Sequence, residues 1–162
     1  MKIRMVMLSV LSLLVLVVVM LSGCGVATPM PSEAATLDKS PESTVEAFYR
    51  WYTHYNGNVM VDEAYRDHAS LTPDVVQKVD DIVASFTHGA YDPFLCAQDI
   101  PQAFEVDAAT VDGDSIASAT AATLTAHGVW NPDTEYESRN DIFVKLSKIN
   151  GVWKIADISC IR

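Results

Sequence analysis

The chain has 162 residues, of which 21 are acidic and 11 basic, so its formal net charge at pH 7 is −10. A surface of this sign repels phosphate backbones and anionic headgroups, which argues against nucleic-acid binding and against peripheral electrostatic binding to membranes. Hydrophobic residues make up 49% of the chain, which is enough to build the core of one ordinary domain.

The first 23 residues have the features of an export signal. Lys2 and Arg4 precede an apolar run from Met5 to Leu21, and a Leu-Ser-Gly-Cys sequence ends at Cys24. Positive, apolar and small-residue regions in this order predict a secretory signal peptide. An uncleaved transmembrane helix is the less favoured alternative, because roughly seventeen apolar residues lie at the bottom of the spanning range.

The cysteine directly after Leu-Ser-Gly resembles the lipobox of bacterial lipoproteins. The resemblance implies cleavage after residue 23, lipidation of Cys24, and stable anchoring by two or three acyl chains. Cleavage removes two basic residues and no acidic one, so 9 basic residues remain against 21 acidic ones and the net charge becomes −12. The expected location is the cell membrane or the outer membrane, with the domain in the periplasm or at the cell surface.

Residues 24–40 are expected to form the lipidated cysteine and a flexible tether. The stretch after Cys24 is small, polar and proline-containing, without an apolar period. A flexible chain of about sixteen residues spans on the order of 20–25 Å, enough to clear lipid headgroups. A single domain is therefore expected over residues 41–162.

Helical signals fill the first part of this domain. Ser40 can cap a helix that begins at Pro41, and apolar residues at helical spacing continue toward Gly57. The apolar stripe of this helix is rich in tyrosine and includes Tyr52. It is expected to face the core; the alternative is that some tyrosine hydroxyls line a pocket.

Two further helices are expected before the pattern changes. A short helix is expected over residues 61–69. A longer one starts at Thr72 and Pro73, again a cap followed by a first-position proline, and closes at His88-Gly89.

The second part of the domain has the period of strands. Residues 103–111 predict a strand, Asp112-Gly113 a two-residue hairpin turn, and residues 116–126 a long second strand. Alternation over residues 142–147 predicts a half-buried strand. Asn150-Gly151 is the strongest turn signal, after which residues 152–160 run back antiparallel. Helices followed by about four antiparallel strands predict an α+β fold.

Three segments resemble the DUF3828 family of exported bacterial proteins, many of them lipoproteins. They are Glu46-Ala47-Phe48-Tyr49, the Tyr-Asp-Pro-Phe-Leu-Cys-Ala-Gln-Asp run at 91–99, and the Gly-Val-Trp-Lys-Ile-Ala-Asp-Ile run at 151–158. The resemblance covers nearly all of residues 41–160. It implies an NTF2-like (cystatin-like) domain, with helices packed on a curved antiparallel sheet around a conical hollow. Such cones serve as enzymes, ligand binders and docking modules, so the fold leaves the function open.

Cys96 and Cys160 remain once Cys24 is used by the anchor. An even pair in an exported protein predicts a disulfide, and two buried free thiols are the alternative. Strand parity places Cys160 on the opposite face from Trp153 unless a bulge intervenes. No His or Cys lies at ligand spacing from either cysteine, so no metal site is expected.

Candidate binding residues lie in the 91–99 segment and in the last strand. Asp92, Gln98 and Asp99 are expected chiefly to turn or cap the loop, and a functional role requires a desolvated or paired carboxylate. Asp157 is expected to point inward with Trp153, where an acid must be paired or neutral. The complete set is Tyr52, Tyr91, Asp92, Gln98, Asp99 and Asp157.

No catalytic signature is readable, and the four histidines are scattered. The favoured function is therefore a protein-binding or docking module of the cell envelope. A cone that binds a small ligand is the alternative, and an enzyme is the least favoured. No cofactor and no nucleic-acid partner are expected. The interior of the cone discriminates among these. A wide cavity lined by tyrosines and one acid favours a ligand, a filled cone with an exposed apolar patch favours a protein partner, and a His/Asp pair that converges inside favours an enzyme.

Overall fold

The structure, a computed structural model, describes residues 40–87 and 91–160. The chain divides after Ala35, and all described residues belong to the second unit, Thr36–Arg162. The expected signal peptide, the lipidation site Cys24 and the tether up to residue 39 lie outside the described residues. Within the described ranges, neither helix combines the length and the hydropathy that crossing a membrane requires.

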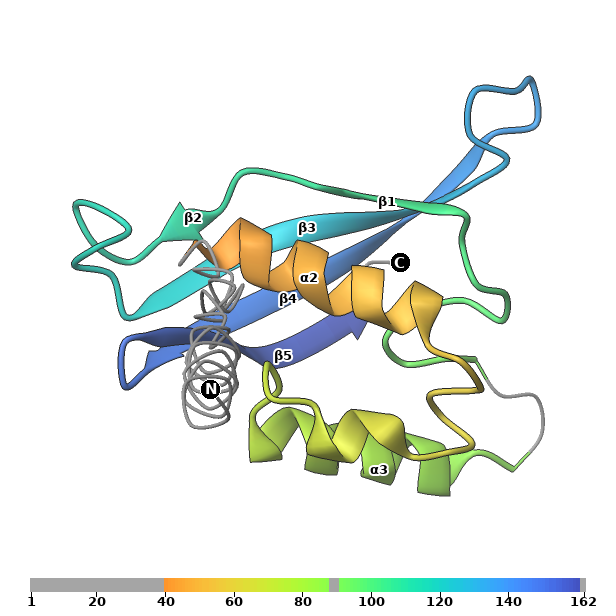
Figure 1. Cartoon of the computed structure of the whole chain (residues 1–162), viewed down its shortest axis with the longest axis horizontal. Coiled ribbons are helices and arrows are strands. Elements are labelled where there is room, and N and C mark those ends of the chain that lie inside the picture. The colour runs from red at the N-terminus through yellow and green to blue at the C-terminus, as the bar shows by residue number, and fades with distance from the viewer. Residues whose placement is uncertain (1–39, 88–90, 161–162) are drawn as a thin grey trace, which may run out of the picture. The chain divides into compact units, whose positions relative to one another are not determined.

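Helix α2 (Pro41–His54) begins as its sequence predicts. The Ser40 hydroxyl accepts a hydrogen bond from Ser43 N at 3.1 Å, and a proline occupies the first turn. The helix ends three residues before Gly57. It lies across one face of the sheet (Figure 1). Its buried side is the apolar stripe, which consists of Val45, Phe48, Tyr49 and Tyr52.

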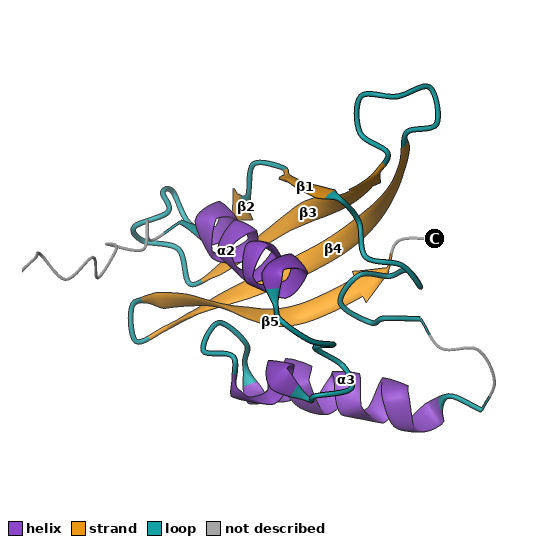
Figure 2. Cartoon of the chain, turned by 45° about the vertical axis from the view of Figure 1, so that its right-hand side comes forward, coloured by secondary structure: helices purple, strands orange, loops and turns teal. Residues whose placement is uncertain are grey.

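Helix α3 (Pro73–Ser85) lies along the last strand of the sheet (Figure 2). Thr72 caps it, with its hydroxyl accepting from Val75 N at 3.4 Å. The helix ends before the expected His88-Gly89 boundary, which is outside the described residues. The helix expected over 61–69 is a 3₁₀ turn, η1 (Ala64–Asp67).

The sheet has five antiparallel strands, one more than expected, and the α+β class is confirmed. The strands are β1 (Ala103–Val106), β2 (Thr110–Val111), β3 (Ala121–Trp130), β4 (Ser138–Ile149) and β5 (Val152–Cys160). Their order is β1-β3-β4-β5, and β2 also pairs with β3. The single strand expected over 103–111 is interrupted because Ala109 N donates to the Glu42 carboxylate at 2.8 Å instead of to a strand.

The two predicted turns have different outcomes. Asn150 and Gly151 have φ values of 53° and 79°, the left-handed backbone that a tight hairpin requires, so that turn is confirmed. The two-residue turn at Asp112-Gly113 is wrong. A longer loop joins β2 to β3, and the Asp112 carboxylate caps its far end by accepting from Thr120 N and Ala121 N at 2.8 and 2.9 Å.

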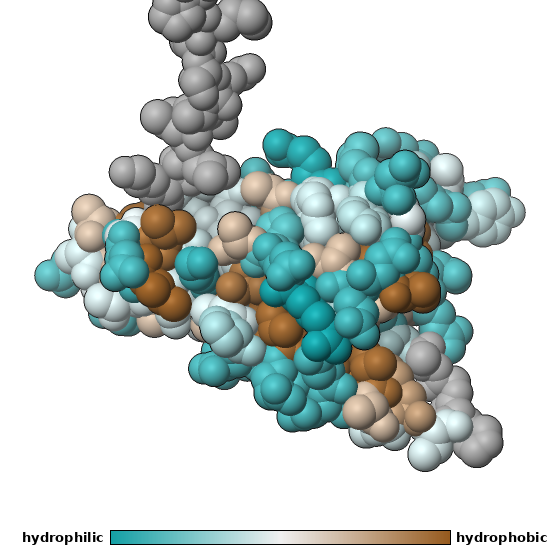
Figure 3. Space-filling model, turned by 60° about the horizontal axis from the view of Figure 1, so that its bottom comes forward, coloured by the Kyte–Doolittle hydropathy of each residue, from teal (hydrophilic) through white to brown (hydrophobic). Residues whose placement is uncertain are grey.

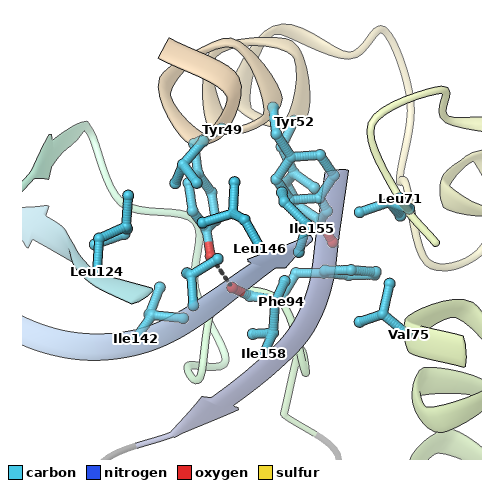
Figure 4. Packing of buried hydrophobic residues seen from close by; sticks show 14 of the residues in the cluster. Tyr49, Tyr52, Leu71, Val75, Phe94, Leu124, Ile142, Leu146, Ile155 and Ile158 are labelled. Carbon is cyan, nitrogen blue, oxygen red and sulfur yellow. Dashed lines mark hydrogen bonds between the residues drawn. The ribbon is translucent and has the colours of Figure 1, made fainter. Parts of the chain in front are cut away.

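Side chains from α2, α3, the sheet and the 91–97 loop form one core (Figure 4). Phe48, Tyr49 and Phe94 expose 0% of their surface, so the space between α2 and the sheet is filled there. Trp153 exposes 2%, and its expected inward position is confirmed. The tyrosine stripe of α2 therefore faces the core.

A β-bulge in β5 changes which residues of that strand face inward. Leu146 pairs with Ile155 but Lys145 pairs with Asp157, so Ala156 is the extra residue. Ile158 and Cys160 therefore face the same side as Trp153. The expected inward position of Asp157 is wrong, since the bulge turns it away from the core. The same bulge brings Cys160 to Cys96, and the two form the expected disulfide.

The segment before α3 covers part of the β5 edge. Ile155 N donates to Ser70 O at 2.7 Å, and Thr72 N donates to Ile155 O at 2.9 Å, a short parallel bridge that the sequence did not predict. Lys78 of α3 donates to Ile158 O on the same edge at 2.8 Å. One edge of the sheet is thus protected from pairing with another strand.

Candidate functional site

Asp92 organises the loop that the sequence marked as a candidate site. Its Oδ1 accepts hydrogen bonds from Phe94 N at 2.9 Å and Leu95 N at 3.3 Å. Its carbonyl oxygen accepts from Cys96 N at 2.8 Å, and its own N–H donates to Ala97 O at 2.7 Å. These bonds close a tight turn, so Asp92 has the structural role that was the favoured expectation.

Two tyrosines of α2 fasten this turn to the helix. The Tyr52 hydroxyl donates a hydrogen bond to Asp92 Oδ2. The Tyr49 hydroxyl donates to Phe94 O at 3.0 Å, the bond that is dashed in Figure 4. Burial raises the pKa of Asp92, against the opposing effect of the hydrogen bonds that it accepts. Burial, together with the nearby Asp92 charge, raises the pKa of both tyrosines. The hydroxyls therefore serve internal bonds and do not line a pocket.

The other candidate residues lie apart from this network. The Tyr91 ring packs against Phe86 with centroids 5.3 Å apart, while Gln98 and Asp99 are exposed. Asp157 lies on the other side of the sheet and is paired with two lysines. The structure thus brings together Tyr52 and Asp92 alone out of the six candidates.

The ion pairs of Asp157 explain how an acid is accommodated next to α3. Its Oδ1 lies 2.6 Å from Lys78 Nζ, and its Oδ2 lies 3.4 Å from Lys145 Nζ. Partial burial would raise the pKa of Asp157, but the two lysines outweigh it and lower the pKa. The pairing that was expected for this acid is present, on the opposite face from the one expected.

A histidine with two acids lies on the face of the sheet away from α2. His127 Nδ1 is 2.8 Å from Asp141 Oδ1, and Nε2 is 3.2 Å from Asp107 Oδ2. Burial alone would lower the pKa of His127, but the two carboxylates raise it. Both ring nitrogens are engaged, so the geometry is that of an ion-paired histidine and not that of a free base. The sequence carries no signal for this cluster, because only strand pairing brings the three residues together.

A groove of about 500 Å³ lies between α2 and the edge strand β1. One wall is the outer side of α2, and the other wall is the continuous stretch 102–106. The polar residues that α2 contributes are Glu46, Arg50, Thr53 and His54. Its floor includes the Phe104 ring, which stacks on Tyr49 with centroids 4.2 Å apart.

Arg50 is chemically distinctive in this groove. Among the lysines and arginines of residues 40–87 and 91–160, Arg50 alone has a side chain that makes no hydrogen bond or ion pair with the protein. The other described cations contact carboxylates or backbone carbonyls; they are Arg66, Lys78, Arg139, Lys145, Lys148 and Lys154. The sequence does not distinguish Arg50, because on the helix alone it is an ordinary solvent-facing position.

Metal-binding geometry is absent from the described part of the chain. There, no group of three or more His, Cys, Asp or Glu side chains is placed to hold an ion. The acids that cluster around His127 and Asp157 are instead paired with cationic side chains.

No protein-family model and no curated protein matches this chain. Several solved structures are similar to it. A chain of the type VI effector–immunity complex Tae3–Tai3 from Ralstonia pickettii is 20% identical with a TM-score of 0.56, over 76% of this chain and 97% of that one. This likeness shows a shared α+β fold.

Two other structures are more distant. A protein of unknown function from Bacteroides thetaiotaomicron is 19% identical with a TM-score of 0.49, over 73% of this chain and 87% of that one. A SEC-C motif-containing protein from Rhodopseudomonas palustris is 14% identical with a TM-score of 0.43, over 76% and 80%.

Proposed function

We propose that the chain is a lipid-anchored docking module of the cell envelope that binds another protein. The observation that carries this proposal is the filled interior. Phe48, Tyr49 and Phe94 are fully buried between α2 and the sheet, and the hydroxyls of Tyr49 and Tyr52 are used by internal bonds. A binding cone for a small ligand needs a hollow in that place.

The outer surface of the domain, unlike its filled interior, has features at which another protein can bind. The groove beside β1 is lined by residues 102–106 at the sheet edge and by the unpaired Arg50 side chain of α2. Apolar side chains on the face in Figure 3 form several separate groups among polar ones. Among the exposed apolar residues, Ile149 and Val152 are cross-strand partners at the β4–β5 turn, and Val152 is 55% exposed. Mixed surfaces of this kind are typical of protein–protein interfaces that are not permanent.

Within this proposal the domain is an NTF2-like member of the DUF3828 family. The family membership rests on the sequence resemblance, while the helices on an antiparallel sheet and the likeness in fold to a chain of the Tae3–Tai3 complex are compatible with an NTF2-like domain. That protein occurs in a complex of two proteins, so an arrangement of this kind is compatible with docking. The fold alone does not select the partner.

The charge of the mature chain narrows the class of partner. At −12 after the expected cleavage, the chain is repelled by nucleic acids and by anionic lipids. A protein with a basic surface is favoured during the encounter, and its association rate is expected to fall as salt is added.

Anchoring is tested through one thiol. The Cys24→Ser chain is expected to stay an unprocessed precursor without lipid, because the thiol is the acceptor of the diacylglycerol. Mass spectrometry of the wild-type and C24S proteins gives the result directly. Acyl chains on the C24S protein would contradict the anchor.

Docking is tested by purifying the native lipoprotein from membranes in mild detergent and analysing both proteins and small molecules by mass spectrometry. A fusion of residues 1–40 to an unrelated domain is the control for material carried by the anchor. The proposal predicts a stoichiometric protein that the control lacks. A stoichiometric small molecule without a protein partner would favour the ligand-binding alternative.

A further inference from the structure

We infer that the β1 edge and the groove beside α2 bind an extended polypeptide segment, which adds to the sheet as a further strand. This inference rests on the proposed docking function and assigns it a site. The segment is expected to carry a basic and an acidic side chain two residues apart, facing Glu46 and Arg50. The occupant is thus defined by main-chain pairing and by two charges.

The hydrogen-bonding pattern of β1 shows which main-chain groups are free. Asp107 N donates to Thr125 O at 2.9 Å, and the register pairs Glu105 with His127. In an antiparallel ladder, alternate residues direct both their N–H and C=O toward the partner strand. Ala103, Glu105 and Asp107 therefore face β3, while the N–H and C=O groups of Phe104 and Val106 face away from it.

The composition of the groove wall agrees with this pattern. All five consecutive residues from Gln102 to Val106 line the groove. Side chains of a strand alternate between faces, so a continuous run can line one hollow only if its main chain is exposed there. In the described part of the sheet, no strand pairs with the outer side of β1, and Figures 1 and 2 show that side open.

The opposite wall supplies two charges at a suitable spacing. Glu46 and Arg50 lie one helical turn apart, which is a rise of about 6 Å. Side chains on the same face of an extended segment repeat about every 6.6–6.8 Å. Neither Glu46 nor Arg50 has a hydrogen bond or ion pair from its side chain to the described residues, so both are available. Glu105 does not compete, because Arg139 Nη2 holds its carboxylate at 3.1 Å.

Other occupants fit these observations less well. A second copy would bring together two chains that each carry a net charge of −10, and like charges oppose association. A small molecule has no main chain to satisfy two donors and two acceptors spaced along a strand. An extended segment satisfies all four and places alternate side chains in the groove.

The test uses the full lipidated chain in detergent micelles and three capped heptapeptides. Two carry the charges in opposite order, Thr-Val-Lys-Val-Asp-Val-Thr and Thr-Val-Asp-Val-Lys-Val-Thr, because the strand direction selects one of them. The third has serine in place of both charged residues. One charged peptide is expected to bind about tenfold more tightly than the serine peptide. It is also expected to slow amide hydrogen exchange at Phe104 and Val106, but not at Glu105, which already bonds to β3.

Two substitutions at Val106 separate the main chain from the side chain. Val106→Pro removes the outward N–H, a change that edge strands tolerate, and is expected to abolish peptide binding. Val106→Ala shortens a side chain of the groove but keeps the N–H, so it is expected to retain peptide binding and exchange protection at Phe104 where V106P loses binding. Melting curves of both variants establish that they are folded; if V106P fails to fold, exchange protection in V106A and the wild type still decides the matter.

Failure of this site is distinguishable from failure of the docking function. If neither charged peptide slows exchange at Phe104 and Val106, or if folded V106P binds as well as the wild type, the edge-strand site is wrong. If V106P nevertheless retains the native protein partner, docking stands and uses another surface. If the wild type itself captures no protein, the docking function fails.

Discussion

Asp92 and His127 are ionisable residues whose side chains have hydrogen-bond partners in other parts of the chain. Asp92 is largely enclosed, yet its carboxylate accepts from two backbone N–H groups and from Tyr52. His127 lies on the open face of the sheet between two carboxylates. In each case the partners come from separate segments, so both residues stabilise the packing of elements rather than a local turn alone.

Replacement of Asp92 tests its structural role. Asp92→Ala leaves two backbone donors and the Tyr52 hydroxyl without an acceptor and is expected to lower the free energy of unfolding by about 2–4 kcal/mol. Asp92→Asn keeps one acceptor oxygen for the backbone and should cost clearly less. Denaturant unfolding of the three proteins measures this. Equal stability of D92A and the wild type would show that the network contributes nothing.

His127 is expected to make the stability depend on pH. Its pKa is raised in the folded chain, so its contribution is complete below the unfolded pKa of about 6.5 and is lost as pH rises through the folded pKa. His127→Gln should therefore melt below the wild type near pH 5.5, and the gap should narrow by about pH 9. A gap that widens with rising pH would contradict the raised pKa.

At the scale of elements, the sequence contained the local signals but not the long-range ones. Ser40-Pro41 and Thr72-Pro73 predicted where α2 and α3 begin, and Asn150-Gly151 predicted the turn before β5, because caps and turns depend on adjacent residues. The Asp112-Gly113 turn failed because Asp112 bonds to residues eight and nine positions away.

The candidate site was predictable only in part for the same reason. The sequence marked Tyr52 and Asp92, and the structure joins them. It placed Asp157 on the wrong face, because one bulge residue, Ala156, reverses the alternation and has no signal of its own. The groove depends on which strand lies at the sheet edge, a property of topology that strand patterns do not contain.

The Cys96–Cys160 disulfide links the 91–97 loop covalently to the end of β5. Its partners are 64 positions apart, a separation for which chain entropy suggests about 4 kcal/mol of stabilisation. A reducing agent should lower the melting temperature, while C96S and C160S should each melt low and be insensitive to it. Thiol titration of the unfolded, unreduced C24S chain is the check. Two reactive thiols would rule the bond out.

On the scale of the whole molecule, the two edges of the sheet are treated differently. The β5 edge is covered by residues 70–72 and by Lys78, whereas the β1 edge is open beside a polar groove. Natural proteins usually protect the edge strands of their sheets. An edge that stays open next to unpaired charges is therefore a place where a segment of a partner can pair with the sheet as a further strand. Because the interior is filled, the proposed binding takes place on the outside of the domain.

Site-specific photo-crosslinking in intact cells tests this assignment most directly. A photoreactive amino acid replaces His54, which lines the groove, or Gln77, which is exposed on α3 and serves as the matched control. We expect a discrete adduct with one other protein from position 54 and none from position 77. No adduct at position 54, or the same adduct from both positions, would contradict it.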